Sequence, residues 1–440
     1  MATNLKRIGE RARRDGKCQF TSIFHHVYDR DHLRACYESM QKGKKPGIDG
    51  ETKESYGEDL EANLEQLSER LARMGWKPKP VRRVYIPKAG SRKRRPLGLP
   101  CFEDKLVQLA FVRVLEQIYE ADFLDCSYGY RPGRSQHQVV DRLGRVIQRG
   151  KVSYVAEADI RGFFEKVDHD WLKKFLEVRI GDERVLRLIW RMLKAGVLEE
   201  GLERASEEGT PQGGVLSALL SNVYLHYALD LWIERRLRRQ LRGEMYYFRY
   251  ADDFVVCFQY RGEAAVYLRQ LTPRLAKFGL EVEPSKTKLL AFGRFAEPDA
   301  RQRGGKPETF DFLGFTFYCG QTRHGSFKVK RRTSRRKFRV KLAEYRQWLR
   351  RQRTHLKTGE MLRQTKRRYE GHLQYYAITD NGDQCQAFGT QLTWLMFRWL
   401  NRRSQRRSHT WKRFYAALDW VDWPQVRIRH NLCPFRVDPV

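Results

Sequence analysis

The sequence of 440 residues lacks the features that identify several common protein classes. Its eight cysteines stand singly, with no C-x-x-C pair and no short Cys/His cluster, so we expect no zinc module. We expect these cysteines to be small buried hydrophobic side chains in a reducing compartment. No apolar run approaches the roughly 18 residues that cross a bilayer, and Glu10 and Asp15 interrupt the N-terminal stretch where an export signal would be apolar. These absences predict a protein that is neither exported nor embedded in a membrane.

Acidic residues are scarce relative to basic ones. There are 86 Lys and Arg against 53 Asp and Glu, so the formal net charge is +33 and the pI is near 10.0. An excess of this size favours a polyanionic partner such as a nucleic acid. Hydrophobic residues make up 41% of the chain, which is enough for packed cores, and the length suggests about three domains.

The hydrophobic pattern predicts a mixture of helices and strands. Residues 58–71 and 106–115 carry apolar side chains at the spacing of one helix face. Expected strands lie at residues 81–87, 96–100, 154–160, 246–258 (a hairpin) and 310–318 (a strand pair). Because the strands and helices alternate without a regular βαβ rhythm, we expect an α+β fold.

A strongly basic segment begins near residue 328. Between Lys328 and Arg368 there are eighteen Lys and Arg but only two acidic residues. Ser334 is placed to cap a helix there, whose apolar stripe would comprise Phe338, Leu342, Tyr345, Leu349 and Leu356. A charged run is often only a solvated face, but this imbalance favours contact with nucleic acid.

The C-terminal region is rich in tryptophan and arginine. The spacing of Leu392, Leu395 and Met396 is typical of the buried face of a helix. We expect Trp394 and Trp399 to belong to that core and the neighbouring arginines to face outward.

Three aspartates stand at expected strand ends. Asp159 ends the apolar strand that begins at residue 154, while Asp252 and Asp253 occupy the tip of the hairpin 246–258. Nucleotidyl transfer needs carboxylates that hold two metal ions about 4 Å apart. If the two strands are neighbours, the three carboxylates converge. Taken singly, each aspartate is equally consistent with a helix cap or a solvated turn.

Several short motifs surround these aspartates in a fixed order. They are Arg83–Lys88, Arg95–Pro100, Tyr128–Ser135, Ala158–Phe164, Gly209–Ser217, Tyr250–Asp253, Gly279–Leu280 with Lys286–Lys288, and Phe312–Phe315. The ordered set resembles the motifs of reverse transcriptases, most closely those of bacterial group II intron reverse transcriptase-maturases. The resemblance runs from about residue 20 to 320 and continues more weakly to residue 405. Without the cysteine pairs of a zinc-bearing HNH endonuclease, the chain resembles the form that lacks this domain.

The resemblance implies a right-hand polymerase with fingers, a palm built on an antiparallel sheet, and a helical thumb. Residues 1–75 would extend the fingers, and residues 76–325 would form the fingers and palm. Residues 326–420 would form the thumb and maturase (X) domain, and residues 421–440 a short tail.

The same resemblance assigns roles in catalysis. Asp159 and Asp252 would ligate two Mg²⁺ ions with help from the carbonyl of Ile160, and Asp253 would complete the catalytic cluster.

It also assigns roles in nucleotide binding. Lys88 and Arg95 would hold the triphosphate, and Gln212 would line the nucleotide pocket. Phe164 would exclude a 2′-hydroxyl, whereas Phe163 is expected in the core; the alternative is that both rings are core residues.

The function implied is an RNA-directed DNA polymerase that binds its group II intron RNA, assists splicing and supports intron mobility. Its partners would be intron RNA, an RNA template–DNA primer duplex, deoxynucleotides and target DNA, in the bacterial cytoplasm and at the nucleoid when it acts on DNA. Two alternatives stay open: an RNA-binding splicing factor with little polymerase activity, and a reverse transcriptase diverted to defence or repair.

Overall fold

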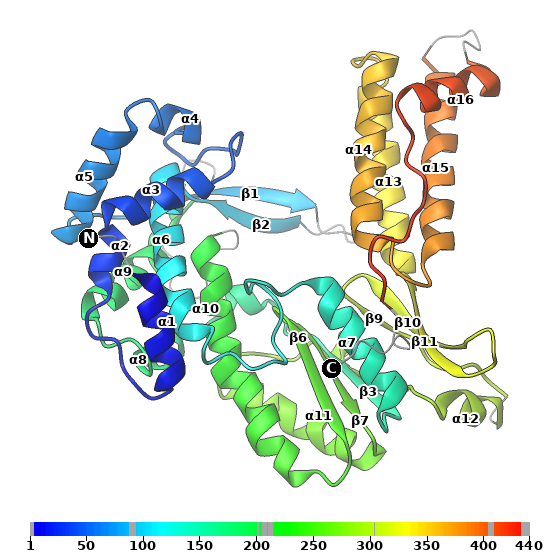
Figure 1. The fold of residues 1–440 in the computed structure, drawn as a ribbon, viewed down its shortest axis with the longest axis horizontal. Coiled ribbons are helices and arrows are strands. Elements are labelled where there is room, and N and C mark those ends of the chain that lie inside the picture. Colours follow the sequence, from blue (N-terminus) through cyan, green and yellow to red (C-terminus); the bar gives the residue numbers. More distant parts are fainter. Residues whose placement is uncertain are drawn as a thin grey trace.

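Three sheets and the helices around them make up the computed structural model (Figure 1). It describes residues 4–87, 94–199, 202–204, 209, 214–302, 304–403 and 409–432. The strands are β1 (Val81–Pro87), β2 (Arg94–Leu99), β3 (Tyr154–Ala158), β4 (Val197–Glu199), β5 (Leu202–Arg204), β6 (Met245–Tyr250), β7 (Asp253–Phe258), β8 (Lys288–Ala291), β9 (Phe310–Phe312), β10 (Phe315–Gln321) and β11 (Phe327–Thr333). The sheet orders are β2-β1-β4-β5, β6-β7-β3-β8 and β11-β10-β9. Apart from the parallel pair β1 and β4, the paired strands are antiparallel, which confirms the predicted α+β class.

The helices fall into three groups. The first is α1 (Leu5–Arg14), α2 (Phe24–Tyr28), α3 (Arg30–Ser39), α4 (Lys53–Tyr56), α5 (Leu60–Ala72) and α6 (Phe102–Tyr119). The second is α7 (Gln136–Arg149), α8 (His169–Glu177), α9 (Glu183–Leu193), α10 (Val215–Leu225), α11 (Arg261–Ala276) and α12 (Ala296–Gln302). The third is α13 (Arg335–Gln352), α14 (Thr358–Tyr376), α15 (Gly382–Leu400) and α16 (Trp411–Trp420). None of the helices in the described ranges has both the length and the apolar composition that crossing a membrane requires.

The central sheet β6-β7-β3-β8 separates two hydrophobic cores. Successive residues of a strand point to opposite faces, so Ala156 and Val256 join the core shared with the N-terminal helices. Val155 and Val255 join the core shared with α7 and the C-terminal helices. Helix α11 contacts β3 and β7, and α7 contacts β6. The sheet is therefore covered on both faces, and only its ends are open to a substrate.

The N-terminal helices pack on α6, which is apolar almost all round. The predicted helix over residues 58–71 is confirmed as α5, and Leu64, Leu67 and Leu71 are fully buried. The predicted strand, turn and return strand over residues 81–100 are confirmed as β1 and β2, while the turn between them lies outside the described residues.

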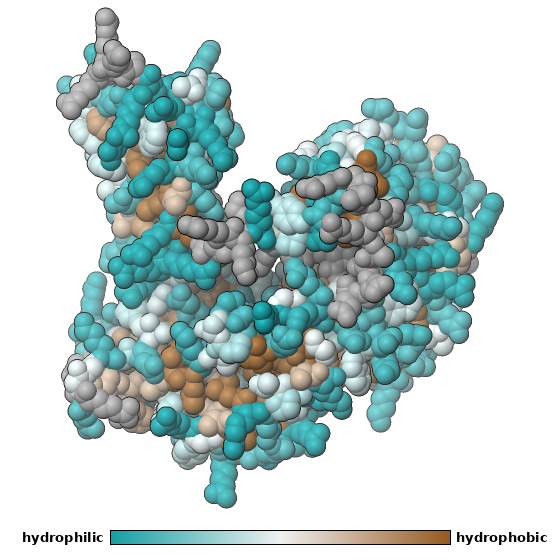
Figure 2. Space-filling model, turned by 180° about the vertical axis from the view of Figure 1, so that it is seen from behind, coloured by the Kyte–Doolittle hydropathy of each residue, from teal (hydrophilic) through white to brown (hydrophobic). Residues whose placement is uncertain are grey.

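Helices α13 to α16 form an upright arm on the sheet β11-β10-β9 (Figure 1). Seen from behind, this helical arm and the N-terminal helices stand on either side of a notch (Figure 2). The Ser334 hydroxyl accepts a hydrogen bond from the backbone N–H of Lys337, which confirms Ser334 as the cap of α13. Tyr345 and Leu349 of the predicted stripe are buried. Leu356 is not on this helix, because α13 ends at Gln352.

One prediction for the arm is wrong. Trp394 is 44% exposed, because the buried face of α15 is the one that carries Leu392, Leu395 and Met396, and position 394 lies beside that face. Trp399 is half-buried against the core of the arm, as predicted.

Candidate active site

The two acid-bearing strands are neighbours, as the sequence predicted. Strand β3 pairs antiparallel with β7, and Ala158 lies opposite Phe254. Asp159 directly follows Ala158, and Asp253 directly precedes Phe254, so both carboxylates emerge at the same end of the sheet. Strands β6 and β7 are joined by a tight hairpin, in which Tyr250 pairs with Asp253. The hairpin tip therefore carries Asp252 to the same end.

The three carboxylates interact electrostatically. Burial raises the pKa of Asp253 to about 7, and the charges of Asp252 and Asp159 raise it further, while Lys286 and Lys337 oppose the rise. Asp253 touches solvent even though much protein surrounds it, which is the position of a side chain at the floor of a hollow. The Asp159 carboxylate forms an ion pair with the Lys286 ammonium. The site thus concentrates negative charge and attracts cations.

Oxygen ligands of this kind suit Mg²⁺. Within the part of the chain that the structure describes, no three His, Cys, Asp or Glu side chains stand close enough together to hold a metal ion as placed. Asp159 is the side chain that must change, because its carboxylate contacts Lys286. A cation bound here would therefore exchange with the Lys286 ammonium.

The backbone around Ile160 leaves a carbonyl available beside the carboxylates. The backbone N–H of Glu283 donates to the Asp159 carbonyl at 2.8 Å, and the N–H of Arg161 donates to the Glu281 carbonyl at 2.9 Å. These two bonds flank Ile160, whose own carbonyl accepts no hydrogen bond from the described residues. The donor set thus fits the carbonyl role predicted for Ile160.

Phe164 lies close to the start of the motif Gly209–Ser217. Phe163 is 2% exposed, which confirms its place in the core, whereas Phe164 is half-buried and meets it edge to face with ring centroids 5.3 Å apart. The N–H of Gly209 donates to the Val167 carbonyl at 3.0 Å. A Cβ on Gly209 would stand 2.7 Å from the Phe164 carbonyl oxygen, so only glycine allows this approach.

Three predicted nucleotide-binding side chains are not described. Lys88 and Gln212 lie outside the described residues. The backbone of Arg95 pairs with Ile86 in the β1-β2 hairpin, but its side chain is outside the described part of the structure. Their assigned roles stay predictions.

Sequence reasoning missed a buried ion pair beneath the hairpin tip. Arg249 and Asp230 are both fully buried, and the guanidinium donates to the two carboxylate oxygens at 2.7 and 2.5 Å. The same guanidinium donates to Asn222 Oδ1 at 2.9 Å and to Ser127 Oγ at 2.8 Å. It also donates to the carbonyl of Ala251 at 3.0 Å. Arg249 therefore holds the residue that precedes Asp252.

This network joins three of the motifs. Asn222, on α10, donates from Nδ2 to the Gly129 carbonyl at 2.6 Å. A Cβ on Gly129 would lie 2.3 Å from the backbone nitrogen of Ala251. Ala251 itself has φ of +55°, a conformation that costs a non-glycine residue about 1–3 kcal/mol. The surrounding contacts hold this strained turn in place. The signal available in the sequence was a charged residue inside each of two apolar runs, Asp230 and Arg249.

Comparison with known proteins identifies the family. Residues 86–317 match the family model described as reverse transcriptase (RNA-dependent DNA polymerase). The chain is 37% identical over 248 residues to Protein YkfC of Escherichia coli (strain K12), which covers 50% of this chain and 64% of that protein. It is 36% identical over 225 residues to the group II intron-encoded protein LtrA of Lactococcus lactis subsp. cremoris, which covers 50% of this chain and 37% of that protein.

A plant relative is more distant. Nuclear intron maturase 1, mitochondrial, of Arabidopsis thaliana is 33% identical over 97 residues, which cover 22% of this chain and 13% of that protein. The chain thus spans less than two thirds of each of these three relatives. Since the family model covers more than half of the chain and includes both acid-bearing strands, the chain belongs to the reverse transcriptase (RNA-dependent DNA polymerase) family.

Proposed function

We propose that the chain is an RNA-directed DNA polymerase whose catalytic residues are Asp159, Asp252 and Asp253. The observation that carries the proposal is the pairing of β3 with β7, which sets the three carboxylates at one end of one sheet. The raised pKa of Asp253 supports it, because Asp252 and Asp159 contribute to that rise. Clustered carboxylates with shifted pKa values are typical of catalytic sites.

In the proposed reaction, the primer 3′-hydroxyl attacks the α-phosphorus of a deoxynucleoside triphosphate. A P–O bond forms to the primer, the bond to pyrophosphate breaks, and the hydroxyl proton leaves to solvent or a nearby base. Two Mg²⁺ ions, held by Asp159, Asp252 and the Ile160 carbonyl, would activate the hydroxyl and stabilise the leaving pyrophosphate. Asp253 would add negative charge that favours their binding.

The nucleotide pocket is proposed around Phe164. Lys88 and Arg95 would neutralise the triphosphate, and Gln212 would line the pocket beside the glycines that follow it. The half-buried ring of Phe164 would contact the sugar and exclude a 2′-hydroxyl. Its closeness to Gly209 supports this role.

We assign the parts of the right hand as follows. Residues 1–75 extend the fingers, and residues 76–325 comprise the fingers, with β1 and β2, and the palm, with the sheet β6-β7-β3-β8. Residues 326–420 are the thumb and maturase domain, and residues 421–440 the tail. The upright helical arm and the notch beside it support a thumb that faces the fingers across the bound duplex (Figures 1 and 2).

Primer extension on an RNA template with Mg²⁺ and deoxynucleotides tests the polymerase. The variant Asp252→Ala/Asp253→Ala should lose detectable extension. The control variant Asp419→Ala, which removes an exposed carboxylate of α16, should extend as the natural chain does. If the double variant retains extension, the catalytic assignment is wrong.

We further propose that the chain binds a group II intron RNA, assists its splicing and supports its mobility at target DNA. Similarity to LtrA and the eighteen basic residues between Lys328 and Arg368 support this proposal. The test is formation of a ribonucleoprotein with the intron RNA at physiological salt, followed by splicing with and without the protein. Splicing that does not respond to the protein would refute it. RNA binding without extension by the natural chain would instead favour a splicing factor.

A further inference from the structure

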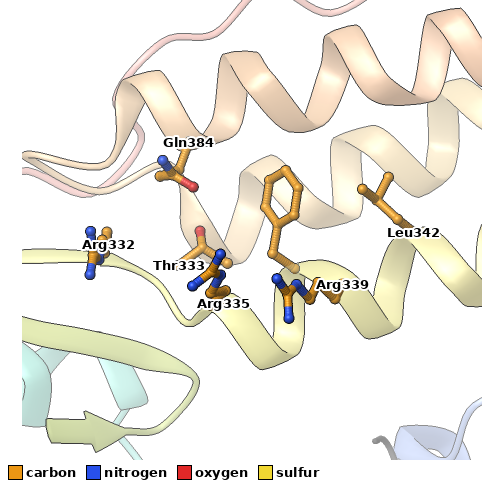
Figure 3. A pocket seen from close by; sticks show the side chains of 7 residues that line it. Arg332, Thr333, Arg335, Arg339, Leu342 and Gln384 are labelled. Atoms are coloured by element: carbon orange, nitrogen blue, oxygen red, sulfur yellow. The ribbon is translucent and has the colours of Figure 1, made fainter.

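A pocket opens where β11 meets α13, at the base of the helical arm. Its volume is about 450 Å³, which lies within the range of roughly 300–1,000 Å³ typical of small-ligand sites. The residues that line it are Arg332 and Thr333 of β11, Arg335, Phe338, Arg339 and Leu342 of α13, and Gln384 of α15. Figure 3 shows the three arginines along one side and Gln384 reaching in from α15. We name it the β11–α13 pocket.

The polar lining suits an anion. Among the described residues that line the pocket, none is acidic, and the side chains of Arg335 and Arg339 form no ion pair there. Arg332 is exposed and lies over the Tyr318 ring, 5.3 Å from its centroid. The nearest acidic residue along α15 is the exposed Asp383, next to Gln384. Three guanidinium groups match the oxygens of a phosphate, which arginine binds with paired hydrogen bonds.

Asp380 does not neutralise these arginines. Its carboxylate is paired with the Lys328 ammonium at 2.7 Å, and both side chains are largely buried. The positive charge of the pocket therefore stays available to a ligand.

The apolar lining suits a base. Phe338 is half-buried and meets Phe388 edge to face, with centroids 5.4 Å apart. This contact orients the Phe338 ring, and Leu342 follows one turn later on the same side of α13. Proteins hold unpaired RNA bases by stacking them on aromatic rings. An aromatic ring beside three arginines thus matches one nucleotide, with its base on the ring and its phosphate on the guanidinium groups.

The floor of the pocket is rigid. Thr333 is 2% exposed, and its backbone N–H donates to Asn381 Oδ1 at 2.7 Å. The Asn381 amide donates back to Thr333 Oγ1 at 2.9 Å. These bonds tie the end of β11 to the start of α15, so a ligand would not have to order this part of the pocket.

The pocket faces away from the catalytic aspartates. Lys337 acts on Asp253 and packs near Gly314, so this lysine marks the side of α13 turned toward the active site. Residues two positions apart on a helix differ by about 200° around its axis. Arg335 and Arg339 therefore lie roughly opposite Lys337.

We propose that the β11–α13 pocket binds one unpaired nucleotide of a structured RNA, outside the duplex that is being copied. Arg332, Arg335 and Arg339 hold its phosphate, and Phe338 stacks on its base. The proposal deepens the RNA-binding function proposed above and rests on it. The pocket adds a contact that reads RNA structure rather than the template.

Binding of a fluorescent RNA hairpin with a ten-nucleotide single-stranded loop tests the proposal. We expect Arg335→Gln/Arg339→Gln to weaken binding about tenfold. The matched control Arg351→Gln/Arg367→Gln removes two exposed charges of the same arm outside the pocket and should change binding less than about threefold. Phe338→Leu keeps an apolar side chain against Phe388 and should also weaken binding about tenfold, with the salt dependence unchanged.

Two further arms separate the outcomes. Extension of a short primer on an unstructured RNA template should be equal in all these variants, with unfolding followed by circular dichroism as a check of the fold. If the pocket and control variants bind the hairpin equally, the proposal is refuted. It is also refuted if the pocket variants weaken extension and blunt-duplex binding to the same extent, or if adenosine monophosphate binds the pocket and the hairpin does not displace it. Loss of extension by the natural chain, with pocket-dependent hairpin binding intact, would refute the polymerase alone.

Discussion

The buried pair Arg249–Asp230 predicts a separation between stability and catalysis. Replacing Arg249 alone by Met leaves the Asp230 carboxylate buried with only the Tyr247 hydroxyl, which donates to it at 2.8 Å. Replacing both, as Arg249→Met/Asp230→Leu, leaves apolar side chains of similar size and no unpaired charge. Both variants remove the guanidinium that holds the carbonyl of Ala251, next to Asp252.

The expected magnitudes follow from this geometry. Breaking a buried ion pair by removing one partner lowers the free energy of unfolding by about 3–5 kcal/mol, whereas replacing both partners by apolar residues is often close to neutral. We therefore expect Arg249→Met to be strongly destabilised and the double variant to recover most of the loss. A displacement of about 1 Å in a catalytic group can reduce the rate about 100-fold. The double variant should accordingly keep a kcat about 100-fold below that of the natural chain.

Urea unfolding and steady-state primer extension measure the two effects. The double variant should show a lowered kcat with the KM for deoxynucleotide nearly unchanged, because the hairpin tip moves while the nucleotide pocket stays. Arg73→Met is the control, since it breaks an exposed pair with Glu69 and should change stability by about 0.5 kcal/mol or less.

Two results would refute this reasoning. If the double variant recovers kcat together with stability, the pair supports only the fold and does not position the hairpin tip. If Arg249→Met is as stable as the natural chain, the guanidinium does not compensate the buried Asp230 carboxylate.

Three other changes have defined outcomes. Phe164→Ala should allow ribonucleotides to be incorporated in primer extension; unchanged discrimination would refute its role as a gate. Burial lowers the pKa of His372 from 6.5 to about 3, and both ring nitrogens lack partners among the described residues. As the pH falls below 6.5 the unfolded chain binds a proton that the folded chain does not, so the folded state loses stability, by about 2 kcal/mol at pH 5. The difference in unfolding free energy between His372→Phe and the natural chain should shift by that amount from pH 7.5 to pH 5, and a constant difference would contradict it. Lys286→Met frees the Asp159 carboxylate, so Mg²⁺ should raise the melting temperature more in this variant than in the natural chain; an equal rise would show that Lys286 does not compete with the cation.

Much of the local structure could be predicted because it depends on neighbours in the sequence. The alternating apolar residues of 246–258 form a hairpin whatever surrounds them, and its tip must carry Asp252 and Asp253. Ser334 caps α13 through a hydrogen bond to a residue three positions away. The net charge of +33 and the motif order likewise follow from the sequence alone, and they sufficed for the family.

The rest depends on contacts between distant residues, which no local pattern contains. Arg249 meets a serine 122 positions away, and the pairing of β3 with β7 joins strands separated by several helices. Trp394 lies on an apolar helix, yet packing turned it outward. The sequence by itself determined which chemical groups are present and which local elements carry them. Only the tertiary structure decided which groups meet, because long-range packing selects one arrangement among many that the local preferences allow.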